Sequence, residues 1–306
     1  MFIASLLILA LLLFSPLQVA QSAQSALLMC LHSVAPSLFP FLAASKIVIL
    51  SRDLRKSPKL FRPIAKFFNI SPMGVWAFFL GLLCGYPIGA KTVCDLYLEQ
   101  QLSKKEATLL LCFCNNAGPA FIIATVGGMF FNRASLGVFL YGCHVLAAVG
   151  MGFALRSFQP PTVLPPSLKE TNEDLPTVVT AAISDAALTM LNITGVIVFF
   201  AAFFEGLRSL NLDFLFHSHP GAEGLFMGLF EFTSGIRLVS QSALSLRHQL
   251  SLTSFLLSFS GLSVFFQVMT FSAKLGLKIT PCMICKVLTG FLAMILCFLL
   301  FPLFYS

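Results

Sequence analysis

Two stretches of this sequence place helix breakers inside segments that otherwise read as membrane helices: Gly81-Leu82-Leu83-Cys84-Gly85-Tyr86-Pro87-Ile88-Gly89-Ala90-Lys91 and Cys114-Asn115-Asn116-Ala117-Gly118-Pro119. Glycine loosens the backbone and proline removes a hydrogen-bond donor, so we expect a helix to break in each stretch. Lipid cannot satisfy the backbone groups that such a break frees, so they must face protein, water or a ligand. The two stretches therefore predict a solute site within the bilayer.

The composition is that of a membrane protein. The chain has 306 residues, of which 58% are hydrophobic and 10% charged, and its mean hydropathy is +0.92. A soluble domain of this size would need a more polar surface. We expect an all-α polytopic protein of the cell membrane with about seven to nine segments near the ~20 residues that cross a bilayer. The apolar runs cover residues 2–19, 26–50, 72–94, 106–130, 134–155, 180–204, 221–240, 251–272 and 284–304.

The basic residues indicate topology rather than a nucleic-acid partner. Six of the nineteen Lys and Arg residues lie in one stretch between two apolar runs, at Arg52, Arg55, Lys56, Lys59, Arg62 and Lys66. A basic loop between membrane segments is typical of the cytoplasmic side. The first apolar run has no basic residue in front of it, so we expect a retained helix rather than a cleaved signal peptide.

The chain also contains an internal sequence repeat. The pattern of Gly81–Lys91 is repeated in Gly228–Arg237, and the corresponding glycines Gly89 and Gly235 are 146 residues apart (235 − 89). A second broken pattern follows each copy at a similar distance, Asn115–Pro119 after the first and Ser258–Ser263 after the second. Interrupted hydrophobic segments at corresponding positions of two halves are typical of transporters. We therefore expect two halves, residues 1–157 and 179–306, joined by a proline-rich linker at 158–178.

The distribution of charge favours re-entrant hairpins. If runs 72–94 and 221–240 enter the membrane and return on the same side, more Lys and Arg fall in cytoplasmic loops than if every run crosses. Three crossings then remain in each half after the first helix. Because three is odd, the two halves are expected to be inverted repeats.

Glu231 is the charged residue that packing explains least, because it lies mid-run at the expected break of the second hairpin. Its carboxylate could bind a solute, hold a coupling cation or accept a proton, with Thr233, Ser234 and Gly235 beside it; the structural alternative is a helix cap.

Lys91 and Asp95 are four residues apart and are expected to pair. The other charges within or near the runs are Lys46, Asp185, Glu205, Arg237 and Lys286.

Asn115 and Asn116 could bind a neutral polar solute beside the break at Gly118, or could equally join helices. Gln267 is a weaker candidate of the same kind, and His144 is expected to form an interhelical hydrogen bond.

The nine cysteines lie mostly in apolar runs and predict no disulfide. The sequence has no catalytic or metal-binding motif, so we expect no enzyme activity and no cofactor.

Four stretches of the sequence resemble the YlbJ-type sporulation integral membrane proteins of endospore-forming bacteria: Ser37–Phe41, Gly85–Lys91, Cys114–Pro119 and Glu231–Gly235. That family is grouped with nucleoside-recognition or gate domains, which are similar to segments of concentrative nucleoside transporters and of the ferrous-iron transporter B. The resemblance implies two inverted repeats with re-entrant hairpins and a role around the cortex stage of spore formation. The second half has no asparagine pair, so its half-site is expected to differ chemically from the first.

The sequence leaves two functions open. The first is a permease for a small polar or anionic solute, such as a nucleoside-like compound, with alternating access. The second is a non-transporting scaffold that recruits spore-envelope partners through the basic loop. The expected partners are the lipid bilayer and the solute, with a coupling cation or proton and a homo-oligomer left open. The expected site residues are Gly85, Tyr86, Pro87, Gly89, Asn115, Asn116, Gly118, Glu231, Thr233, Ser234, Gly235 and Gln267.

Overall fold

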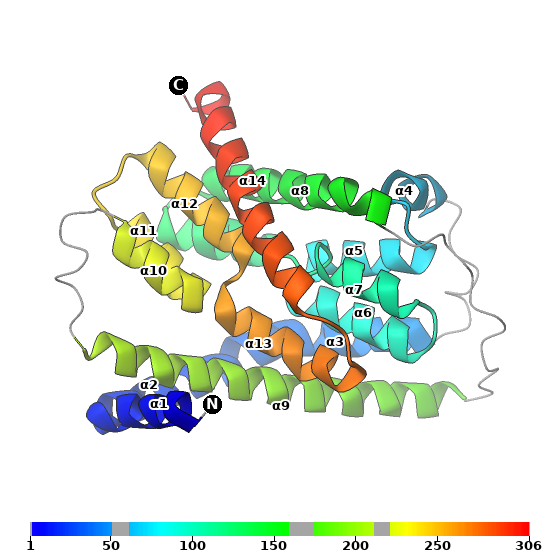
Figure 1. Ribbon diagram of the computed structural model, residues 1–306, viewed down its shortest axis with the longest axis horizontal. Coiled ribbons are helices and arrows are strands. Elements are labelled where there is room, and N and C mark those ends of the chain that lie inside the picture. Colours follow the sequence, from blue (N-terminus) through cyan, green and yellow to red (C-terminus); the bar gives the residue numbers. More distant parts are fainter. Residues whose placement is uncertain (1, 51–60, 159–173, 211–220, 306) are drawn as a thin grey trace.

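The computed structural model describes residues 2–50, 61–158, 174–210 and 221–305. Every regular element in these ranges is helical, which confirms the all-α class (Figure 1). Five helical segments are long and apolar enough to cross a membrane, and a sixth arises if a bent pair counts as one span. The chain is therefore a multi-pass integral membrane protein. The five segments are Pro16–Leu50, Ala134–Phe158, Leu175–Arg208, Leu246–Leu275 and Thr280–Phe304.

The N-terminal helices differ from the expected boundaries. Helix α1 (Phe2–Phe14) ends before Ser15, and one continuous helical segment then runs from α2 (Pro16–Met29) through the π-helical turn η1 (Cys30–Val34) into α3 (Ala35–Leu50). We expected the first run to continue to residue 19 and a gap before residue 26. The break falls earlier because Pro16 has no amide donor and fits the first turn of a helix.

The rest of the first half contains a hairpin and a broken helix. Helix α4 (Phe61–Phe68) is bent by 93° against α5 (Pro72–Cys84), which turns at Gly85–Pro87 and packs against α6 (Ile88–Leu98). Helix α7 (Lys104–Leu111) then ends, an extended stretch follows, and the π-helix η3 (Ala120–Phe130) continues the path. Helix α8 (Ala134–Ala154) with the short 3₁₀ turn η4 (Leu155–Phe158) completes this half.

The second half has a similar order of elements, without a described counterpart of α4. Long helix α9 (Leu175–Arg208) is followed by the hairpin α10 (Ala222–Phe230) and α11 (Phe232–Ser240), and then by α12 (Leu246–Phe259) and α13 (Gly261–Ser272), which are separated by Ser260. The 3₁₀ turn η6 (Ala273–Leu275) leads into α14 (Thr280–Phe304). Helix α9 begins at Leu175, so it includes the last four residues of the expected linker. Residues 159–173 of that linker, and Arg52, Arg55, Lys56 and Lys59 of the basic loop, lie outside the described residues.

The two halves pack reciprocally. Helix α6 contacts α13, and α11 contacts η3, so each hairpin touches the broken helix of the other half. In the same way α7 contacts α14, and α8 contacts α12. In Figure 1 the hairpins α5–α6 and α10–α11 lie on opposite sides of the molecule, with α9 along one edge.

Close backbone approach fixes the first hairpin. A Cβ atom added to Gly81 would lie 1.7 Å from the carbonyl oxygen of Cys114, and one added to Gly89 would lie 2.0 Å from the same atom. No side chain fits between these backbones, so glycine is required on both arms. The carbonyl of Cys114 is thereby held against the crossing point of α5 and α6.

We expect Gly81→Ala to destabilise the protein by roughly 3 kcal/mol, because the added methyl must separate α5 from Cys114. The matched control is Gly142→Ala in α8, where an added Cβ meets nothing within 4 Å. That substitution should be neutral or stabilise by about 0.5–1 kcal/mol. Unfolding of both purified variants in one detergent tests this, and equal stability would contradict the close approach.

Candidate functional site

The tips of the two hairpins meet through aromatic rings. Tyr86, at the turn between α5 and α6, packs edge-on against Phe232, the first residue of α11, with ring centroids 5.1 Å apart. Phe121, near the start of η3, packs against the same Phe232 ring at 5.3 Å. The two hairpin tips and the first helix break therefore converge on one aromatic cluster.

Each break also touches the hairpin tip of its own half. A Cβ added to Gly85 would lie 2.9 Å from the amide nitrogen of Gly118. In the second half a Cβ on Gly261 would lie 3.1 Å from the amide nitrogen of Phe232. The amino-terminal ends of α6, η3, α11 and α13 are thus gathered near the contact between the two halves.

These four helix ends are not equivalent electrostatically. Glu231 is the N-cap of α11: its Oε1 accepts a hydrogen bond from the amide of Thr233 at 2.9 Å, and its Oε2 accepts one from Ser234 at 2.7 Å. The starts of α6, η3 and α13 have no side-chain cap among the described residues. Because a helix N-terminus carries partial positive charge, Glu231 offsets this charge at one end and leaves it uncovered at three.

The stretch between α7 and η3 buries two amide side chains. Asn115 is 2% exposed and Asn116 is fully buried. The side-chain nitrogen of Asn116 donates to the carbonyl of Phe113 at 2.7 Å. Within the described part of the chain, the Oδ1 atoms of both asparagines and the hydroxyl of Tyr86 are buried without a hydrogen bond. Unbonded buried polar atoms are costly, so the two amide oxygens can accept a hydrogen bond from a polar group that reaches them, and the hydroxyl can donate or accept one.

His144 in α8 links the two broken helices. Its Nε2 accepts a hydrogen bond from the amide of Ala117 at 3.1 Å, and its Nδ1 lies 2.7 Å from the hydroxyl of Ser258 in α12. Because an amide can only donate, Nε2 is unprotonated in this arrangement. The expected interhelical role of His144 is confirmed.

Lys286 in α14 reaches the first break from the other half. Its side chain is 1% exposed, and its ammonium donates to the backbone carbonyl of Asn115. Among the described residues no carboxylate pairs with it. The sequence marked Lys286 as a charge in an apolar run but indicated no partner, since Asn115 is 171 residues away.

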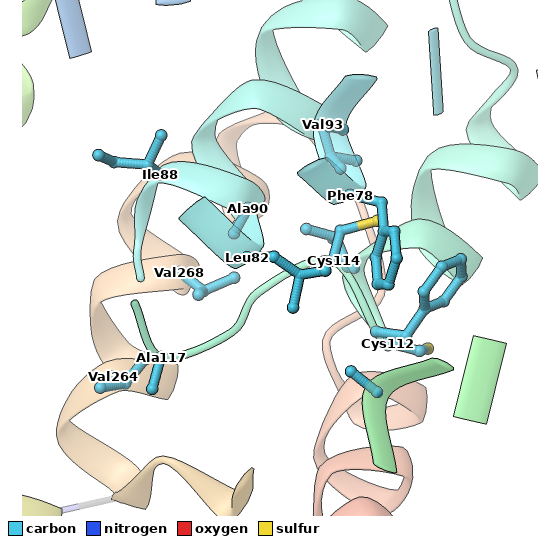
Figure 2. Close-up of a cluster of buried hydrophobic side chains, with 14 of the residues drawn as sticks. Phe78, Leu82, Ile88, Ala90, Val93, Cys112, Cys114, Ala117, Val264 and Val268 are labelled. Atoms are coloured by element: carbon cyan, nitrogen blue, oxygen red, sulfur yellow. The ribbon is translucent and has the colours of Figure 1, made fainter. Parts of the chain in front are cut away.

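The hydrophobic surroundings of the first break appear in Figure 2. Ala117, at the break, belongs to one buried hydrophobic cluster with Val264 and Val268 of α13 and with Leu82 and Ala90 of the hairpin. All five are buried. The polar groups of the break are therefore enclosed by apolar packing between the two halves.

A second polar cluster begins one turn into α6. Lys91 Nζ is 2.6 Å from Asp95 Oδ1, which confirms the expected pair, and 2.7 Å from Asp185 Oδ2 of α9. Lys46 of α3 lies 3.3 Å from Asp95 and 3.9 Å from Glu99. This network joins α3, α6 and α9, and it includes partners that sequence spacing did not indicate.

The remaining expected site residues lie partly at the first hairpin tip and partly away from the helix breaks. Pro87 lies at the first hairpin tip, while Gly89 and Gly235 lie at helix crossings, where Gly235 packs on Gly228. Gln267 is buried in α13, six residues after the break at Gly261, and α13 as a whole contacts α6, α9 and α10. The described residues contain no group of three His, Cys, Asp or Glu side chains that could hold a metal ion.

The helices and their breaks define a class: a polytopic membrane protein with a hairpin and a broken helix in each half. Comparison with known proteins adds the family. The chain is 30% identical over 319 aligned positions to the sporulation integral membrane protein YlbJ of Bacillus subtilis (strain 168), covering 94% of this chain and 78% of the relative. The chain therefore belongs to the YlbJ-type sporulation integral membrane proteins. No protein-family profile and no solved structure matches it.

We expect Lys91→Met to destabilise the protein by about 3 kcal/mol, because it leaves Asp185 without its cation and Asp95 with only Lys46. Adding Asp185→Asn should recover part of this loss. Lys105→Met, at an exposed position on α7, is the charge-matched control and should change stability by less than about 0.5 kcal/mol. Unfolding in detergent would contradict the network if Lys91→Met and Lys105→Met behaved alike.

Proposed function

We propose that this protein is a permease that moves a small polar or anionic solute, such as a nucleoside-like compound, across a membrane during spore formation. The observation that carries the proposal is the meeting of the hairpin tips at Tyr86 and Phe232 beside the two helix breaks. Discontinuous helices that meet within the membrane are how secondary transporters build their binding sites. We propose transport rather than catalysis.

The order and packing of the elements support two inverted repeats. The elements follow the order of a long helix, a hairpin, a broken helix and a second long helix. This order occurs once from α3 to α8 and again from α9 to α14. A two-fold axis between the repeats requires the hairpin of each repeat to contact the broken helix of the other. The contacts of α6 with α13 and of α11 with η3 fit this requirement. With each hairpin returning to its own side, each repeat crosses the membrane three times, so the second repeat is inverted.

The polar groups at the breaks suit a solute that both donates and accepts hydrogen bonds. Asn115 and Asn116 provide buried acceptors, and the uncapped starts of α6, η3 and α13 provide amide donors and partial positive charge. Glu231 adds a carboxylate at the fourth helix end, where a cation or a proton could bind together with the solute. We place the site at these groups.

Access to this site requires the two repeats to move. Asn115, Asn116 and Ala117 are buried, and His144 and Lys286 connect the breaks across the repeats. A shift of one repeat against the other would release these connections and open the site to one side of the membrane. Such a motion is the alternating access typical of transporters with repeated halves.

The first test is ligand stabilisation followed by transport. The purified protein is screened by thermal unfolding with nucleosides, dipicolinate and common anions, because a ligand that binds only the folded state raises its apparent stability. A stabilising compound is then tested for uptake into proteoliposomes. We expect Asn116→Ala and Glu231→Gln to lower both the stabilisation and the uptake by at least about tenfold in apparent affinity, the loss of roughly one strong hydrogen bond.

Two controls separate the site from general damage. Glu223→Gln changes a carboxylate in the first turn of α10, and Gln18→Ala removes an exposed amide from α2; both should leave binding unchanged. Glu231→Gln keeps one oxygen for the cap and should cost about 1 kcal/mol in stability. A folded protein that no compound stabilises, or unchanged uptake in both site variants, would refute the permease and favour a scaffold.

A further inference from the structure

The outer face of α9 carries a polar side chain that its surroundings do not satisfy. Asn192 is the eighteenth of the 34 residues of this helix and is exposed. In the described part of the chain no hydrogen bond is found for its amide. At mid-helix of a membrane span the surrounding hydrocarbon offers no donor or acceptor, and such amides usually bond to another helix.

A hollow lies directly beside Asn192. It has a volume of about 310 Å³ and is lined by side chains of α9 and α13, among them Asn192, Gly195, Phe199, Phe266 and Thr270. Gly195 leaves open space on this face, since an added Cβ would meet nothing within 4 Å. The α9 surface can therefore be approached closely at the level of Asn192.

The same face also has projecting side chains. Leu188 and Leu191, within one turn of Asn192, are 64% and 69% exposed. A surface that carries both projections and a hollow can be complementary to itself across a two-fold axis. An amide is likewise self-complementary, because it has two donors and an accepting oxygen.

We propose that the outer face of α9 binds a second copy of this chain in the membrane, with the two Asn192 amides hydrogen-bonded to each other across a two-fold axis. Leu188 of one copy would occupy the hollow beside Gly195 of the other. A lipid acyl chain could fill the hollow but has no group that satisfies Asn192, so a protein partner fits better. This interface does not depend on the permease function, because it uses none of the groups at the helix breaks.

The decisive measurement is the number of chains per particle in a bilayer. The full chain, labelled once at its C-terminus, is reconstituted at decreasing protein-to-lipid ratios, and photobleaching steps are counted to obtain the dimerisation constant. We expect a dimer whose constant weakens about tenfold in Asn192→Leu, as for the loss of an interhelical amide pair. Asn192→Gln should retain most of the affinity, and Leu299→Ala on the exposed side of α14 should match the unchanged protein.

Disulfide crosslinking gives an independent result that does not depend on the stability of Asn192→Leu. Asn192→Cys should crosslink two copies in the bilayer under oxidation, whereas the unchanged protein and Ile284→Cys, at an exposed position of α14, should not. A chain that is monomeric at every density would overturn the proposal. So would a dimer that is unaffected by Asn192→Leu and does not crosslink through residue 192.

Discussion

The structure depends on satisfying backbone groups that two broken helices expose inside a membrane. Hydrocarbon cannot bond these groups, so the protein must do so itself. In the first break the carbonyl of Cys114 is held against Gly81 and Gly89, the carbonyl of Asn115 accepts from Lys286, and the amide of Ala117 donates to His144. Each contact needs an element from elsewhere in the chain, so the break forms only when the hairpin, α8 and α14 are in place.

Charge is handled in two different ways. On α6 and its neighbours, Lys91 faces two carboxylates and Lys46 faces two, so the charges compensate one another within a network. At the first break Lys286 has a carbonyl as its partner and no carboxylate among the described residues. The first arrangement stabilises helix packing between α3, α6 and α9. The second places a cationic group on the backbone of Asn115, in a stretch where two amide side-chain oxygens have no hydrogen bond among the described residues.

The proposed site lies between the two halves, and the proposed interface lies on the outer face of the second half. The hairpin tips and breaks face the contact between the repeats, whereas Asn192 and its hollow face outward from α9. Helix α9 also packs against α1, α2 and α3. A dimer through α9 would fix this helix in the membrane while the hairpins and broken helices move.

The sequence by itself determined the membrane class, the helix breaks, the hairpins and the pairing of Lys91 with Asp95, because hydropathy, glycine, proline and spacing of four residues act over a few positions. It did not determine that 16–50 forms one helical segment, that Glu231 caps α11, or that Gln267 lies away from the break. The contacts of Lys286 with Asn115, His144 with Ser258 and Lys91 with Asp185 came only from the tertiary structure. These pairs are 94 to 171 residues apart, and only the packing of one half against the other brings them together.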